Sequence, residues 1–479
     1  MKKLSHIFYT LTLLLFFLSN LALAQIPGKF QKFIDQGEFI KAQELMRDEL
    51  ANNMNMDAQQ RLDITFQIER FDRIKKDFTR TKQYILDYIK QYVPDVKEKD
   101  LLKWEQEKSL EYRIIDGEKK YFKWAGANLF RINKKLKAIK KAKDKPGPPP
   151  VYDRLEDVKE IIKQAKESGN KYVKPAYVRV TYTLTVNENV VPESKIIRCW
   201  SPFPREIPNR QTDVKLISCD PKGYIIAPNE NNLQRSIYFE KPAIKGEETK
   251  FLVIFEFKNY AVFQVINPKL VKPVKVTPEL KPFLAERAPH IIFTDDLKAL
   301  SKKIVGEEKN PYFIARKIFK YINDNIPWAS AREYSTIANV SDYVYQNHHC
   351  DCGMHAIFFM TMCRLNGIPT RWQSGWTTKP GGGGMHDWGE IYFEPYGWLP
   401  VDSDVGLVNS KNEQEKWFFL GGMDAYRLIV NEDYSRQLYP AKIHFRSETI
   451  DFQRGEVEWE GGNLYFDLWE WDYKVELLN

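Results

Sequence analysis

The chain has 479 residues, of which 43% are hydrophobic, 28% charged and 14% aromatic. This composition excludes a largely disordered chain, and the length suffices for about three domains. The formal net charge of +8 is small for such a length, so we expect no nucleic-acid partner.

Residues 1–24 have the pattern of a signal peptide. Lys2 and Lys3 form a basic start, an apolar run follows, and the small-x-small pattern at 22–24 marks a cleavage site. An uncleaved membrane anchor is the alternative, but the run is short. No later stretch reaches the ~20 apolar residues of a membrane helix. We therefore expect an exported protein, periplasmic or secreted, without a transmembrane anchor.

Residues 25–171 are predicted to form a mainly helical domain. Apolar residues recur at helical spacing through much of it, and Asp116 and Gly117 predict a tight hairpin. Seven lysines between 134 and 145 precede the proline-rich stretch 146–150. We interpret them as an exposed helix tail leading into a stiff linker; a basic patch for nucleic acid or membranes is the alternative.

Residues 172–280 are predicted to form a β-sandwich domain. Apolar and polar residues alternate over 178–186, and further short strands are separated by turn residues. Cys199 and Cys219 lie in this segment and could pair. The odd number of cysteines, five, indicates at least one free thiol.

Residues 281–410 contain the candidate catalytic residues. After two predicted helices, the nearly all-apolar run 356–365 predicts a buried helix that ends at Asn366 and Gly367. Cys352 lies at the start of that helix, where the unpaired N–H groups favour negative charge. We therefore expect the pKa of its thiol to be lowered from about 8.5 into the range of roughly 3.5–7.5. Its own amide can then serve in an oxyanion hole.

Two alternatives surround Cys352. Cys350 is a rival nucleophile, but it precedes the helix and lacks the dipole. His348 and His349, with the two cysteines, suggest a soft metal site, but the HHCxC spacing matches no common zinc pattern. We expect no metal and no cofactor. Cys363 lies inside the apolar run and is interpreted as a core residue.

A predicted hairpin follows at 386–402. If Phe393 faces Gly397 across the turn, then His386 and Asp402 share one sheet face as diagonal neighbours, roughly 7–8 Å apart. A carboxylate at that place can orient an imidazole by accepting its second N–H. A register slip of one residue would separate the two side chains.

Two other carboxylates compete for this role. Asp387 points to the opposite face of the hairpin, whereas Asp404 has the right parity but lies beyond the strand end. The run of glycines at 381–384, just before the histidine, is a loop that could gate the site or be an inert connection.

Residues 411–479 are predicted to be β-rich. Alternating residues flank a turn at 460–463, which indicates a C-terminal β-meander. The predicted fold class is therefore α+β and multidomain, with a helical region, a β-sandwich, a catalytic core and this C-terminal meander.

Three motifs carry a resemblance to a known family. GIPxR at 367–371 follows the cysteine helix, HxWxExY occupies 386–392, and GWxPxD occupies 397–402. In this order they resemble the transglutaminase-like superfamily over about residues 310–405. The preceding helical and β-sandwich segments resemble those of exported bacterial proteins with this core.

The resemblance implies a papain-like core with Cys352 as nucleophile, His386 as base and Asp402 as orienting carboxylate. A tryptophan upstream of the cysteine stabilises the oxyanion in related enzymes, which makes Trp328 a candidate, although packing alone would explain it equally well. Tyr334 is a second candidate for the substrate cleft.

The implied chemistry is acyl transfer at an amide through a thioester. We favour a cysteine hydrolase, a peptidase or amidase acting on a peptide, protein or other amide substrate. A protein-crosslinking transglutaminase and a non-catalytic cell-envelope binding module are the alternatives. The sequence gives no indication of oligomeric state.

Overall fold

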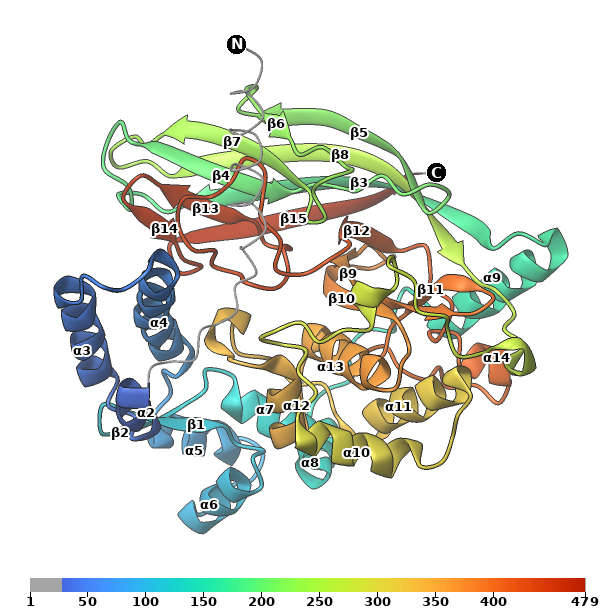
Figure 1. Cartoon of the computed structure of the whole chain (residues 1–479), viewed down its shortest axis with the longest axis horizontal. Coiled ribbons are helices and arrows are strands. Elements are labelled where there is room, and N and C mark those ends of the chain that lie inside the picture. Colours follow the sequence, from blue (N-terminus) through green and yellow to red (C-terminus); the bar gives the residue numbers. More distant parts are fainter. Residues whose placement is uncertain (1–27, 479) are drawn as a thin grey trace.

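The computed structural model of the chain describes residues 28–478. The predicted signal peptide at 1–24 lies outside this range. Figure 1 shows a β-sandwich along one side, with two helix-rich regions beneath it. The fold thus mixes helices with antiparallel sheets, as the sequence predicts.

The first helix-rich region comes from the N-terminal part of the chain. Its elements are α2 (Gly28–Asp35), α3 (Phe39–Asn52), α4 (Ala58–Asp77), α5 (Lys82–Lys90), α6 (Glu98–Gln106), β1 (Tyr112–Ile115), β2 (Glu118–Tyr121), α7 (Ala125–Ile132) and α8 (Lys134–Lys143). They enclose a hydrophobic core of their own. Ile115 pairs with Glu118 across Asp116 and Gly117, so the predicted hairpin is confirmed.

The β-sandwich consists of two antiparallel sheets. One has the order β14-β13-β4-β7-β6 and the other the order β15-β3-β8-β5. The strands are β3 (Tyr172–Val186), β4 (Ile196–Pro202), β5 (Gln211–Asp220), β6 (Ile225–Ile226), β7 (Ser236–Pro242), β8 (Thr249–Val262), β13 (Glu456–Trp459), β14 (Gly462–Leu464) and β15 (Trp469–Leu478). Inward-facing residues of both sheets form its core.

The C-terminal strands are divided between these two sheets instead of forming a meander by themselves. The hairpin β13–β14 adds to β4, and β15 pairs with β3 from Trp469 to Leu478. The physical reason is that β3 and β4 would otherwise each leave a row of backbone groups unpaired at a sheet edge. In Figure 1 the red C-terminal strands lie beside the green strands of the sandwich.

The second helix-rich region surrounds the sheet β11-β10-β9-β12. Its elements are α9 (Arg154–Ser168), η2 (Pro268–Leu270), η3 (Lys281–Phe283), α10 (Asp295–Val305), α11 (Pro311–Asn325), η4 (Tyr334–Thr336), α12 (Val340–Asn347), α13 (Cys352–Leu365), β9 (Thr370–Thr377), β10 (Gly384–Phe393), β11 (Gly397–Val401), α14 (Glu413–Lys416) and β12 (Arg427–Asn431). Helix α9 packs into this core and not into the N-terminal one.

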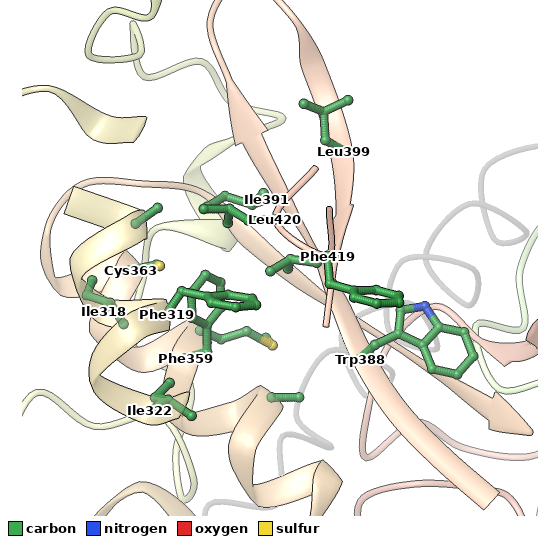
Figure 2. Close-up of a cluster of buried hydrophobic side chains, with 14 of the residues drawn as sticks. Ile318, Phe319, Ile322, Phe359, Cys363, Trp388, Ile391, Leu399, Phe419 and Leu420 are labelled. Atoms are coloured by element: carbon green, nitrogen blue, oxygen red, sulfur yellow. The ribbon is translucent and has the colours of Figure 1, made fainter. Parts of the chain in front are cut away.

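The central helix of this region, α13, is buried along most of its length. Figure 2 shows its side chains Phe359 and Cys363 among those of α11 and of the strands β10 and β11. The rings of Phe319 from α11 and Phe359 pack edge to face, with their centroids 6.2 Å apart. Close packing on both sides holds the N-terminus of α13 in a fixed position against the sheet.

The N-terminal region is joined to the core by polar contacts as well. Arg70 donates to the carbonyl of Thr336 at 3.0 Å, and Asn128 donates to the carbonyl of Ser330 at 2.8 Å. Both acceptors lie in the segment between α11 and α12, Thr336 within η4. The helical region therefore supports the segment that precedes α12.

All five cysteines are free thiols. Cys199 lies on β4 and Cys219 on β5, in different sheets, so they do not form the pair that the sequence left open. None of the helices within residues 28–478 is both long and apolar enough to span a bilayer.

The placement of β15 in the sandwich predicts which side-chain substitutions lower the free energy of unfolding. Trp469 at the start of β15 is buried in the sandwich core, so Trp469→Ala should lower the free energy of unfolding by about 3–5 kcal/mol. The exposed neighbour Glu470→Ala should change it by less than about 0.5 kcal/mol. Urea denaturation of both variants measures the difference. Equal midpoints would contradict the placement of β15.

Candidate active site

Cys352 is the first residue of α13, as predicted. The carboxylate of Asp351 caps the helix by accepting from the amide of Met354 at 3.1 Å, and it also accepts from the hydroxyl of Tyr334 at 2.8 Å. The Cys352 thiol donates to Oδ2 of Asp387 at 3.3 Å. The cysteine therefore lies among carboxylates at the helix start.

The expected lowering of the thiol pKa is wrong for this structure. Burial raises the pKa of Cys352 well above its usual value, and the charges of Asp387, Asp351 and Asp404 raise it further. A nearby negative charge opposes the formation of a second one. The resting form is a neutral thiol bound to Asp387.

The hairpin register that the sequence predicts is confirmed. Phe393 pairs with Gly397, and the pairing continues to Gly389 and Val401. His386 and Asp402 are consequently diagonal neighbours, and the His386 Nε2 atom lies 2.7 Å from Oδ2 of Asp402. This is the geometry in which a carboxylate orients an imidazole.

Asp402 is buried and held by an ion pair and by hydrogen bonds. Arg427 of β12 lies 2.9 Å from its Oδ2 atom and also pairs with Asp424 at 3.0 Å. The amide of Val405 donates to Oδ1 at 3.0 Å. Burial would raise the pKa of Asp402, but His386 and Arg427 outweigh burial and hold that pKa well below its usual range.

A permanently ionised Asp402 determines the tautomer of His386. Because an ionised carboxylate only accepts hydrogen bonds, Nε2 carries a proton, and in the neutral ring Nδ1 presents its lone pair. Oδ2 of Asp404 lies 3.9 Å from Nδ1, too far for a hydrogen bond. Nδ1 is thus the ring atom that is able to accept a proton.

Asp387 is the residue that the sequence argument undervalued. It does point away from the face of His386, but that opposite face is the one on which its carboxylate meets Cys352. Gln453 donates to its Oδ1 atom at 2.7 Å and to the carbonyl of His386 at 2.9 Å. Burial and the charge of Asp351 raise the pKa of Asp387 well above its usual value. Strand parity indicates the face of a residue but not what packs against that face.

The site contains a second histidine, His355, that the sequence analysis did not identify. His355, one turn into α13, has Nδ1 2.8 Å from Asp404 and Nε2 2.9 Å from the carbonyl of Ile326. Both partners are acceptors, so both ring nitrogens donate and the ring is an imidazolium. Burial disfavours that charge, but Cys350 and Asp404 raise the pKa of His355 well above its usual value. Its i+3 spacing from Cys352 was the only available signal.

The predicted residues thus fall into two groups. His386 and Asp402 form one, and Cys352 with Asp387 forms the other. Among the described residues no hydrogen bond joins Cys352 to His386. Asp404 lies between the groups, because it contacts both histidines and contributes to the pKa of Cys352.

The two candidate cleft residues lie differently. Tyr334 is buried, with its hydroxyl on Asp351. Trp328 is 44% exposed, and its backbone runs parallel to that of Cys350 in an isolated bridge. The Arg131 guanidinium from α7 lies 5.0 Å from the centre of its ring. Trp328 remains available at the surface beside the segment that leads to the cysteine.

His386, Asp402 and Asp404 have ligand atoms within 4.8 Å of one another, so these three residues could hold a metal ion. Arg427 and the imidazolium of His355 already neutralise the two carboxylates, which weakens the donor set for a cation.

A cavity of 290 Å³ opens onto His386 and Asp404. Tyr152 and Arg154, from the end of the proline-rich linker and the start of α9, form part of its wall, together with Lys379. The glycine loop lies against the same linker, since a Cβ at Gly381 would come within 2.9 Å of Val151. The linker and the loop together therefore border the access to His386.

Residues 298–403 match the family model described as transglutaminase-like superfamily. A candidate cysteine protease from Cytophaga hutchinsonii is 14% identical over 64% of this chain and 92% of its own, with a TM-score of 0.44. The periplasmic domain of TgpA from Pseudomonas aeruginosa is 13% identical over 52% of this chain and 90% of its own, with a TM-score of 0.26. No curated protein matches the chain.

The two solved structures are too distant to bear on the activity of this chain. The family match covers the segment that contains Cys352, His386 and Asp402, and it begins within α10 and ends just after β11. Residues 298–403 are therefore a transglutaminase-like core within a longer chain.

Proposed function

We propose that the protein is an exported cysteine hydrolase that cleaves amide bonds through a thioester. One observation carries the proposal. The imidazole of His386 is oriented by its contact with Asp402, and it lies in the same transglutaminase-like core as Cys352 at the start of α13. The signal-peptide pattern at 1–24 supports action in the periplasm or outside the cell.

In the proposed mechanism, the thiol of Cys352 first exchanges its hydrogen bond to Asp387 for one to His386. Cys352 leaves Asp387 and gives its proton to Nδ1 of His386. The thiolate then attacks the carbonyl carbon, and the amide of Cys352 at the helix start stabilises the oxyanion. His386 returns the proton to the departing amine as the C–N bond breaks. Water, activated by the same imidazole, hydrolyses the thioester and releases an acid.

Asp402 has a positioning role in this scheme. It keeps the proton on Nε2 and stabilises the imidazolium that forms, while Arg427 keeps Asp402 ionised. Asp387 in its ionised form has the opposite effect, because its charge opposes the formation of the thiolate. The enzyme would thus rest in a form of low thiol reactivity.

A non-catalytic binding role is the second candidate. The observation that favours it is the resting contact of Cys352 with Asp387 and not with His386. Crosslinking by transamidation shares all steps up to the thioester and differs only in the final acceptor. The experiments below separate these three functions.

Cys352→Ala should remove hydrolysis of fluorescently quenched casein by the mature protein, with a loss on the order of 10³-fold or more. Cys219→Ala, at a free cysteine in the sandwich, is the control and should keep full activity. Incorporation of dansylcadaverine into casein by the wild type would instead indicate a transglutaminase. If the wild type neither cleaves nor incorporates amine, the binding role is favoured.

Asp402→Asn should lower kcat by roughly 10²–10⁴-fold and leave KM nearly unchanged, because the amide can donate to Nε2 and reverse the tautomer. Steady-state kinetics on a substrate peptide identified from casein measures this split. Asp324→Asn on the surface of α11 is the control. A larger effect on KM than on kcat would contradict the positioning role.

Asp387→Asn should make Cys352 more reactive at neutral pH. Removal of the carboxylate charge lowers the thiol pKa, and each pKa unit raises the thiolate fraction about tenfold. The wild-type alkylation rate should still rise with pH above 9, since its thiol pKa is raised. Iodoacetamide labelling of Cys352, followed by peptide mass spectrometry from pH 6 to 10, measures both profiles. Superimposable profiles would show that Asp387 does not suppress the thiolate.

A further inference from the structure

A second cavity lies away from His386, where the N-terminal region, the core and the segment 434–449 meet. It has a volume of 220 Å³ and shares no lining residue with the cavity over His386. Phe66 of α4, His290 and Tyr334 are among the residues that line it. The mechanism proposed above makes no use of this space.

Buried polar atoms without partners surround this cavity. Among the described residues, His290 Nδ1, the hydroxyl of Tyr434 and His444 Nε2 have no hydrogen-bond partner within the protein. His290 is 3% exposed and Tyr434 is 1% exposed. An unsatisfied buried donor or acceptor is costly and rare in folded proteins. Several such atoms lining one cavity indicate a bound molecule that satisfies them.

The charged residues that line the cavity are all basic. Its lining contains Arg287, Arg436, Lys442 and Arg446 but no aspartate or glutamate. Carboxylates outside the lining pair with these four side chains, for example Asp433 with Arg287.

Arg70, however, has no such partner. It is buried on α4 one turn after Phe66, and no carboxylate of the described residues lies within ion-pair distance of it. It reaches the cavity wall, since it donates to the carbonyl of Thr336, between the lining residues Ser335 and Ile337. A buried cation without a counterion is expensive, and an anion in the cavity would offset that cost.

The size and walls of the cavity restrict what can enter. Phe66, Leu438 and Phe445 give it an apolar surface beside the polar atoms. An apolar cavity of about 150 Å³ holds a benzene ring, so 220 Å³ accommodates a ring with a short side chain. Neutral His290 suits a ligand with an acceptor group, and burial, Arg70 and Arg287 lower the pKa of His290 to about 3.

We propose that this cavity binds a small organic anion, a carboxylate on an aromatic or short aliphatic body. The carboxylate accepts from Tyr434 and His290 near the guanidinium of Arg70, and the apolar body lies against Phe66 and Phe445. The binding site does not require Cys352, so this proposal is independent of the proposed hydrolase activity.

The test is calorimetric titration of the full-length mature Cys352→Ala protein with 3-phenylpropanoate. Saturable one-to-one binding in the micromolar to low millimolar range is expected. The neutral 3-phenylpropanamide should bind at least tenfold more weakly, and the cation 3-phenylpropylammonium should not bind. Absence of saturable binding of the acid up to 10 mM, or equal binding of the ammonium compound, would overturn the proposal.

Two variants locate the site. Tyr434→Phe removes only the unpaired hydroxyl, so it should fold normally and weaken 3-phenylpropanoate binding about tenfold. Ala441→Trp places an indole at a lining position and should abolish binding. Tyr177→Phe, on the exposed face of β3, is the matched control and should bind like the parent. Unchanged binding by both cavity variants, with circular dichroism matching the parent, would place the ligand elsewhere and refute the assignment.

Discussion

The pairing of β10 with β11 is the constraint on which the candidate site depends. The antiparallel register fixes which residues of the hairpin face each other, and that alone brings His386 to Asp402. Arg427, from the neighbouring part of the same sheet, then keeps the carboxylate charged. One sheet therefore positions the base, its orienting group and the counterion, while the nucleophile arrives separately on α13.

The electrostatic environment of Cys352 has opposing effects on the pKa of its thiol. The helix terminus offers roughly half a positive charge and stabilises an anion by about 0.3–1 kcal/mol. A full carboxylate charge nearby opposes the thiolate with up to about 4 kcal/mol at 4 Å and an effective dielectric constant of 20. Asp387 lies at 3.3 Å and Asp351 at the cap. Burial of the thiol, together with these carboxylates, outweighs the dipole, and the pKa of Cys352 is therefore raised.

Local features of the fold could be predicted from the sequence because local chemistry determines them. Asn366 and Gly367 end the helix of Cys352, and side-chain parity with a short turn determines the hairpin register. The partners of β13 and β15 could not be predicted, since they lie more than two hundred residues earlier in the chain. The contact of Asp387 with Cys352 and the pairing of His355 with Asp404 likewise depend on how α13 packs against the sheet.

The position of β15 also bears on how the chain acquires its structure. Strand β3 is made early, yet its partner on one side, β15, consists of residues 469–478, nearly three hundred positions later. Contacts between such distant segments close large loops and slow folding. Until the last strand is available, β3 keeps an open edge that can pair with other chains. The sandwich thus closes only when the last strand of the chain is in place, and the intermediate that precedes closure is exposed to aggregation.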